Sequence, residues 1–256
     1  MKIELLNKQI FDVQSLIDKM SDDEYYYGYL SENALSSSSI KDLLDSPKTY
    51  KFRKEHGSKE SQPLRDGWLA HTCILEPDVF AAQEFVDVQS KNTKAFREAK
   101  AINPKVFTMK EKKDAERVTD AFLRNEKALR YLTGAEFEVP IIGMVDGYPF
   151  RGKADILGKD FIADIKTTTD VKGFRYSANK YHYDVQCYLY CQLFGIDYDK
   201  FTFIIIDKGS LDIGIAHCSE EFYLSGRDKV QKAIHSYQTF FEDGVDIDSF
   251  YIEMTL

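Results

Sequence analysis

The stretch FRGKADILGKDFIADIKTTT, residues 150–169, decides the fold of this chain. It holds two runs of β-forming residues separated by Gly158-Lys159-Asp160, which is typical of a tight turn. Side chains alternate between the faces of a strand, so Asp164 and Lys166 share one face. A hairpin with a loop of two or four residues pairs positions whose numbers sum to 319, which sets Asp155 opposite Asp164. The sequence thus predicts two carboxylates and one ammonium on a single patch of a mostly apolar hairpin.

This charged patch suits a divalent metal ion. Mg²⁺ is held by one or two carboxylates together with waters and phosphate oxygens, and a bound ion acidifies its water and stabilises a phosphodiester under attack. Lys166 is able to orient or help deprotonate the attacking water, or to offset charge that develops in the transition state. The competing interpretation is an ordinary hairpin in which Lys166 pairs with Asp164 in solvent, because a three-residue motif often arises by chance.

Three further motifs accompany the hairpin. They read LSSSSIK at 35–41, followed by Ser46-Pro47, then GWLAH at 67–71, and QCYLY at 186–190. Together with Asp155 and, after eight intervening residues, Asp164-Ile165-Lys166, they resemble the PD-(D/E)XK nuclease superfamily, with Asp in the (D/E) position. GWLAH and QCYLY are similar to the GxxxH and QxxxY motifs of its RecB-type branch, and LSSSSIK resembles the start of RecE-type phage exonucleases. The resemblance extends from about residue 34 to 240.

The resemblance implies the roles of individual side chains. The residues implied to bind Mg²⁺ or Mn²⁺ are Asp155, Asp164, His71, Glu138 and the carbonyl of Ile165. Lys166 is implied to assist the water nucleophile, with Gln186 and Tyr190 supporting the site. By strand periodicity alone, Glu136 and Glu138 share a face and either is able to meet the metal, although Glu138-Val139-Pro140 matches the family setting better.

Without the resemblance, several of these residues have simpler interpretations. His71 lies on the apolar face of a predicted helix over 63–76, where a histidine is more often part of the core. Gln186 and Tyr190 are four residues apart on one helical face, and a core tyrosine with a capping glutamine would give the same pattern.

The chain is expected to form a single α/β domain, a restriction-endonuclease-like core with a central mixed sheet flanked by helices. Residues 1–34 are an N-terminal extension and the core spans about 35–243. The expected helices are 40–44, 63–76, 108–132, 181–194 and 219–241, and the expected strands are 85–88, 135–142, 150–157, 161–166 and 201–206. Residues 89–107 and the basic segment 171–180 are expected to be loops.

Charge is unevenly distributed along the chain. The net charge is −8, which by itself argues against a nucleic-acid binder. Residues 91–130, however, hold twelve Lys and Arg against six Asp and Glu, and residues 47–59 hold five against one. Focused basic stripes attract phosphates even on an acidic protein. The other interpretation of these segments is that they are solvated helix faces.

The resemblance implies a metal-dependent exonuclease that degrades one strand of duplex DNA from a 5′ end. Such enzymes supply a single-strand annealing protein in phage-type recombination, and relatives form homo-oligomeric rings. The alternatives are a structure-specific endonuclease on the same fold and a catalytically idle DNA-binding recombination scaffold. Some RecB-type nucleases carry an iron–sulfur cluster ligated by cysteines that flank the core; the four cysteines here lack that distribution, so we expect no cluster. The cysteines are also too few for a disulfide framework, and neither a signal peptide nor a membrane span is expected, so we expect a cytoplasmic protein.

Overall fold

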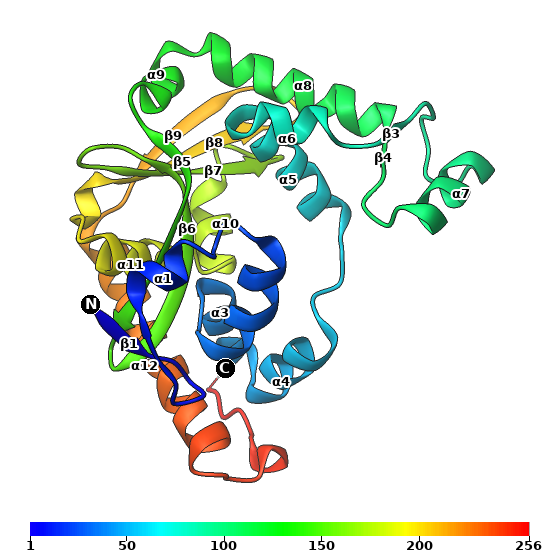
Figure 1. Ribbon diagram of the computed structural model, residues 1–256. Helices are drawn as coiled ribbons and strands as arrows, with labels where there is room; N and C mark the ends of the chain where they lie inside the picture. Colours follow the sequence, from blue (N-terminus) through cyan, green and yellow to red (C-terminus); the bar gives the residue numbers. More distant parts are fainter. Residues whose placement is uncertain (256) are drawn as a thin grey trace.

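The computed structural model describes residues 1–255 and is built around one five-stranded mixed sheet (Figure 1). Its strands, in spatial order, are β5 Glu136–Val145, β6 Tyr148–Leu157, β7 Ile162–Thr168, β8 Phe201–Asp207 and β9 Ile213–His217. The first three form an antiparallel meander, β8 runs parallel to β7, and β9 returns antiparallel to β8. The predicted single α/β domain with a central mixed sheet is therefore confirmed. The sequence pattern does not predict β9, because its five residues form only a short alternating run.

The β6–β7 hairpin has the predicted register. Its two ladder pairs, Ile156 with Ala163 and Leu157 with Ile162, both sum to 319. The N–H of Gly158 donates to the carbonyl of Phe161 at 2.9 Å and closes the loop. No further pair joins the described residues of β6 and β7, so the two strands diverge directly beyond the hairpin end.

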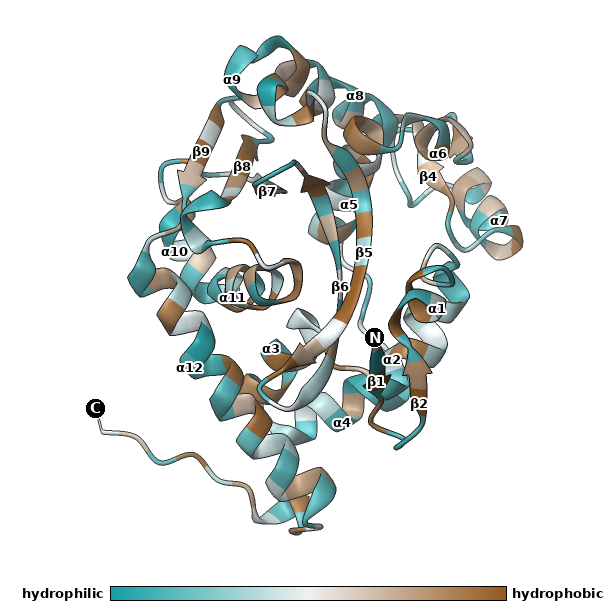
Figure 2. Ribbon diagram, turned by 60° about the vertical axis from the view of Figure 1, so that its left-hand side comes forward, coloured by the Kyte–Doolittle hydropathy of each residue, from teal (hydrophilic) through white to brown (hydrophobic). Residues whose placement is uncertain are grey.

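Helices cover both faces of the sheet, because the buried strands present apolar side chains to both. Along β8, Phe201, Phe203 and Ile205 belong to one apolar cluster, and Ile204 and Ile206 to another. The first cluster is completed by α3 Ser37–Asp45, α11 Tyr183–Phe194 and α12 Glu220–Tyr237, and the second by α5 Gln62–Leu75 and α8 Met109–Arg124. Figure 2 shows β8 as one of the most apolar segments of the sheet.

The connection from β7 to β8 differs from the prediction of a basic loop over 171–180. Residues Phe174–Lys180 form helix α10, which leads into α11. Asp170 starts the turn by accepting the N–H of Gly173 at 2.9 Å. Phe174 and Ala178, four residues apart, are buried and give α10 an apolar face. The predicted loop was wrong because two buried side chains outweigh the polar composition.

The predicted loop over 89–107 is also only partly correct. Lys94–Ile102 forms helix α7, with Thr93 as its N-cap and Phe96 buried. The predicted helix over 108–132 begins as expected, with a capping box between Thr108 and Glu111. It ends at Arg124, because the Asn125 side chain accepts backbone N–H groups and starts a new helix. The short elements around these helices are β3 Phe85–Val86, β4 Phe107–Thr108, α4 Pro47–His56, α6 Pro77–Ala81 and α9 Glu126–Leu129.

The N-terminal segment, residues 1–34, packs on the sheet through its own apolar cluster, which includes Ile142 of β5. Its elements are β1 Lys2–Glu4, β2 Ile10–Asp12, α1 Val13–Ile17, a π-helix Tyr25–Tyr29 and α2 Leu30–Asn33. At its end Leu35 bonds to β6, donating its N–H to the carbonyl of Pro149 at 2.9 Å and accepting the N–H of Arg151 at 2.8 Å. The segment is thus continuous with the fold and lies beside β6, the strand that carries Asp155.

No helix among residues 1–255 is long and apolar enough to cross a membrane.

Candidate active site

The site lies where β6 and β7 diverge. Beyond the last ladder pair, the backbone of β7 bonds to a side chain of β6 instead of to its backbone. The Asp155 Oδ2 atom accepts the N–H of Ile165 at 2.8 Å. This bond fixes the carboxylate at the opening between the strands. The predicted register continued by one step sets Asp155 opposite Asp164, and both residues are at the site.

His71 connects Asp155 with a third carboxylate. Its Nε2 atom lies 3.1 Å from Asp155 Oδ2 and 3.2 Å from Glu138 Oε1. His71 is on α5, which packs across the sheet face, and Glu138 is on the edge strand β5. Glu138 has a left-handed backbone with φ of 53°, unusual for a residue other than glycine and a conformation that costs about 1–3 kcal/mol. Such outliers often mark functional sites.

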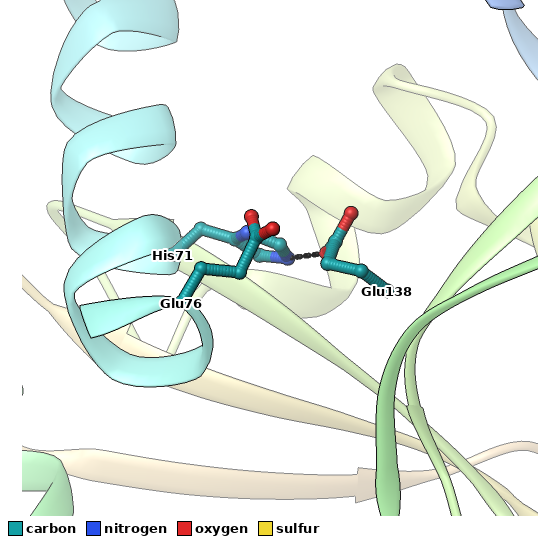
Figure 3. A group of neighbouring side chains, drawn as sticks. All are labelled: His71, Glu76 and Glu138. Atoms are coloured by element: carbon teal, nitrogen blue, oxygen red, sulfur yellow. Dashed lines mark ion pairs between the residues drawn. The ribbon is translucent and has the colours of Figure 1, made fainter. Parts of the chain in front are cut away.

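Glu76 completes a compact group of potential metal ligands. One donor atom each of His71, Glu76 and Glu138 lies within 4.8 Å of the others, and Figure 3 shows the side chains of His71 and Glu76 approaching Glu138 from α5. The sequence prediction did not include Glu76. Its only signal was its place five residues after His71, directly at the end of the helix.

Glu136, the other strand glutamate considered, is exposed and is not a member of this group. The structure therefore places Glu138, rather than Glu136, beside His71.

Asp164 and Lys166 form the second half of the site. Asp164 is 1% exposed, and its carboxylate is in ion-pair contact with the Lys166 ammonium and accepts a hydrogen bond from the Gln186 amide. The Lys166 ammonium also lies over the Tyr183 ring, 4.9 Å from its centroid. Gln186 thus orients the Asp164 carboxylate, which in turn positions the Lys166 ammonium. The contact between Tyr183 and Lys166 was not predicted, because only the packing of α11 on the sheet brings the Tyr183 ring beside the ammonium.

Tyr190 lies on the same face of α11 as Gln186 but contacts a different strand. Its hydroxyl donates to the carbonyl of Lys153 at 3.0 Å and accepts the N–H of Lys153 at 3.3 Å. This contact supports β6 two residues before Asp155. Gly152 makes room for it, since a Cβ atom there would lie 2.8 Å from the Tyr190 ring.

No contact of the Ile165 carbonyl is described, so its part in metal binding stays a prediction. The N–H of the same residue donates to Asp155 at the site.

The electrostatics of the site show an excess of buried negative charge. Burial raises the pKa of Glu138 to about 7, with Asp155 adding to the effect and His71 opposing it. Burial also raises the pKa of Asp164 to about 6, again with a contribution from Asp155. Burial would lower the pKa of His71, but Asp155 and Glu138 outweigh it and raise the value to about 9. The His71 Nε2 atom thus lies between Asp155 and Glu138, which both favour its protonated form.

These residues fit a divalent cation. A bound cation stabilises the ionised form of nearby carboxylates. A cluster of carboxylates with raised pKa values is therefore expected at a cation site. The buried Asp164 Oδ1 atom, although in ion-pair contact with Lys166, has no hydrogen-bond partner among the described residues. Oxygen donors with one imidazole are a ligand set that Mg²⁺ and Mn²⁺ accept.

A cleft of about 960 Å³ opens onto the site. His71, Glu76, Glu138 and Asp155 line it, together with Arg53 of α4. Tyr26, Tyr27 and Tyr29 of the N-terminal segment also line the cleft. The metal-ligand group is thus accessible from solvent, while the Asp164 side chain is enclosed behind it.

Comparison with known proteins agrees with the fold. A family model described as a PDDEXK-like domain of unknown function (DUF3799) matches residues 36–246. The crystal structure of a candidate exonuclease from Eubacterium rectale has a TM-score of 0.67 and 16% sequence identity, and covers 92% of this chain and 95% of that chain. A phage-related exonuclease from Haemophilus somnus has a TM-score of 0.37 and 14% identity, with 82% of this chain and 96% of that chain covered. No curated protein matches the sequence.

Proposed function

Because the chain belongs to the PDDEXK-like family DUF3799, we propose that it is a metal-dependent DNA exonuclease that hydrolyses phosphodiester bonds at the ends of duplex DNA. The observation that carries this proposal is the grouping of Asp155, Asp164 and Lys166 at the point where β6 and β7 diverge. The family and the fold support a nuclease, and the carboxylates with the lysine supply the chemistry of one.

In this proposal Asp155, Glu138 and His71 hold Mg²⁺ or Mn²⁺, and Glu76 joins them. Asp164 and the carbonyl of Ile165 remain proposed ligands from the family resemblance. A bound ion would activate a water molecule and stabilise negative charge on the phosphate. The Ile165 N–H orients the Asp155 carboxylate, and Asp155 lines the cleft.

Lys166 is the proposed catalytic cation. Burial disfavours its charged form, but Asp164 and Asp155 outweigh burial and raise the pKa of Lys166 above its usual value. We expect its ammonium, which contacts the Asp164 carboxylate, to stabilise charge on the phosphate electrostatically. Gln186 and Tyr190 act as positioning residues, since one bonds the partner of Lys166 and the other bonds the strand that carries Asp155.

An end-dependent nuclease is distinguished from an endonuclease by its substrates. We expect Mg²⁺-supported degradation of an end-labelled linear duplex, with no cutting of the same sequence as a closed circle. Cutting of the circle would instead support the structure-specific endonuclease. Cleavage of neither, with intact binding, would support the recombination scaffold.

Separate experiments determine the direction of digestion and the oligomeric state of the protein. By the resemblance, we expect release of nucleotides from the 5′ end, which labels at opposite ends of one strand will distinguish. We also expect a homo-oligomeric ring, measured by sedimentation equilibrium, and an interaction with a single-strand annealing protein in the cytoplasm.

A further inference from the structure

The cleft contains two exposed aromatic side chains that the proposed metal chemistry does not use. Tyr27 is 63% exposed and Trp68 is 42% exposed, and both line the same cleft as His71 and Asp155. Tryptophan is highly buried on average in folded proteins, and tyrosine is intermediate. Two such exposed side chains at one catalytic cleft therefore need an explanation.

Trp68 is held as a rigid platform. It lies on α5 three residues before His71, so the two share one face of the helix. Its ring stacks on Phe107, with ring centroids 5.5 Å apart and planes within 7° of parallel. The guanidinium of Arg65 lies 4.3 Å from the Phe107 centroid, and Arg65 is itself fixed by an ion pair with Glu111 at 3.0 Å.

A different feature of the fold positions Tyr27. It belongs to the π-helix Tyr25–Tyr29, a rare conformation that is frequent at functional sites. The neighbouring Tyr26 is buried, and the Arg151 guanidinium of β6 lies 4.4 Å from its ring centroid. Tyr27 packs edge-on against Tyr26, with centroids 4.9 Å apart. The π-helix is thus anchored on the strand of Asp155 with Tyr27 left open to the cleft.

Nucleobases are the part of a DNA substrate that such platforms recognise. Stacking of a base on an aromatic side chain contributes about 1–3 kcal/mol and does not depend on sequence. The bases of an intact duplex are already stacked and paired, so they are unavailable to side chains. Arg53, Lys54 and Lys153 also line the cleft, each paired with a carboxylate.

We propose that the cleft binds an unpaired strand of DNA whose bases stack on Trp68 and Tyr27. This inference rests on the proposed nuclease function and specifies its substrate: a duplex end must open before its strand reaches the carboxylates. A blunt duplex would contact the cleft only weakly until its terminal pairs separate.

Trp68 makes the proposal directly measurable, because it is the single tryptophan of the chain. The wild-type protein is titrated in EDTA, which prevents metal-dependent cleavage, while tryptophan fluorescence is recorded. The probes are an oligothymidylate of roughly 12 nucleotides, a length typical of single-strand sites, an abasic strand of the same length, and a blunt duplex. We expect saturable quenching by oligothymidylate and at least tenfold weaker binding of the abasic strand and of the duplex.

The variant Tyr27→Ala tests the second platform. We expect it to weaken oligothymidylate binding about tenfold, equivalent to about 1.4 kcal/mol, and to leave the weak abasic binding unchanged. Tyr27→Trp should retain binding. The matched control is Tyr251→Ala, which removes a tyrosine that is 76% exposed outside the cleft, and it should bind as the wild type does.

The outcomes separate this inference from the proposed function. Equal affinity for oligothymidylate and abasic strand, no quenching by any strand, or unchanged binding by Tyr27→Ala would overturn the stacking proposal even if the enzyme digests DNA. Base-dependent quenching without any Mg²⁺-supported digestion would uphold strand binding and contradict the nuclease proposal. Quenching by neither nucleic acid but by a protein partner would assign the aromatic pair to protein docking and overturn it.

Discussion

At the scale of single residues, the site is a set of buried charges that hold one another in place. Asp155 contacts His71, and Asp164 contacts Lys166, so each of the two aspartates has a basic neighbour. The pairing of Asp155, Asp164 and Lys166 was predictable from the sequence because all three lie within one hairpin. Glu76 and Tyr183 were not, since they reach the site only when α5 and α11 pack on the sheet.

Replacement of Lys166 tests the proposed catalytic charge. Lys166→Ala should reduce the cleavage rate by roughly 10²–10³, the scale seen when one preorganised stabilising group is removed. Lys166→Arg should recover only part of the rate, because the planar guanidinium places its charge differently. Single-turnover digestion of labelled DNA measures both variants, and an unchanged rate for Lys166→Ala would refute the assignment.

Replacement of Glu76 tests the ligand that the sequence did not predict. Glu76→Gln should raise the Mn²⁺ concentration needed for half-maximal cleavage by about 10–100-fold, as for groups that support a metal site. Glu136→Gln, which alters the exposed glutamate of β5, is the matched control and should leave that concentration unchanged. An equal effect of the two substitutions would remove Glu76 from the site.

At the scale of elements, helices α5 and α8 are joined by a buried ion pair. Arg65 of α5 contacts Glu111 of α8 at 3.0 Å, and Gln62 donates to the same carboxylate at 2.9 Å. The capping box of α8 was predicted from Thr108 and Glu111, but the partner from α5 was not, since sequence spacing carries no information about which helices meet. The helices α7 and α10 were missed for a similar reason: one or two buried side chains decide them.

This ion pair makes stability depend on pH. Burial would raise the pKa of Glu111, but hydrogen bonds from Arg65 and Gln62 outweigh it and lower the value to about 2. A carboxyl with a lowered folded-state pKa contributes stability above its usual value of 4.5, and that stability is lost as the pH falls from there toward 2. We expect a loss on the order of 2 kcal/mol. Urea unfolding across this pH range measures it.

The matched variants for that experiment are Glu111→Gln, which should flatten the acid dependence, and Glu98→Gln, which alters an exposed glutamate of α7 and should not. An acid dependence of Glu111→Gln identical to that of the wild type would contradict the assignment.

Helix α11 supports the site through close contact with β6. Gly152→Ala would force a Cβ atom to within 2.8 Å of the Tyr190 ring, so we expect a loss of about 1–3 kcal/mol in the free energy of unfolding. Gly67→Ala is the control, because a Cβ there would lie 3.6 Å from Thr167, an ordinary contact. Denaturant unfolding should show Gly67→Ala as stable as the wild type. Equal stability of both variants would show that Tyr190 is not closely packed.

At the scale of the whole molecule, the basic residues divide into two groups. Four ion pairs along α8, such as Lys110 with Asp114 at 2.5 Å, neutralise much of the basic segment, which favours the interpretation of a solvated helix face. Arg53 and Lys54 line the cleft, where Arg53 pairs with Asp42 at 3.1 Å and Lys54 with Glu32 at 3.4 Å. The sequence located both basic segments, but only the packing of α4 beside the site shows which of them is near the carboxylates.

The salt dependence of DNA binding tests which of the two basic segments contacts DNA. Reversing Arg53 and Lys54 to Glu should weaken DNA binding and reduce the log–log salt slope by roughly 0.9 per lost phosphate contact. Reversal of Lys112 and Lys113 on α8 should change the slope little. Fluorescence anisotropy with labelled DNA at several salt concentrations measures both. A larger effect of the α8 variant would place the DNA on the other face of the sheet.

The central claim is that the carboxylates at the divergence of β6 and β7 form a divalent metal site. Calorimetric titration of Mn²⁺ into wild type, Asp155→Asn and the control Asp160→Asn, an exposed residue of the same hairpin turn, tests it most directly. The account predicts saturable heat for the wild type and for Asp160→Asn, and none for folded Asp155→Asn. Absence of saturable heat in the wild type, or unchanged heat in Asp155→Asn, would contradict it.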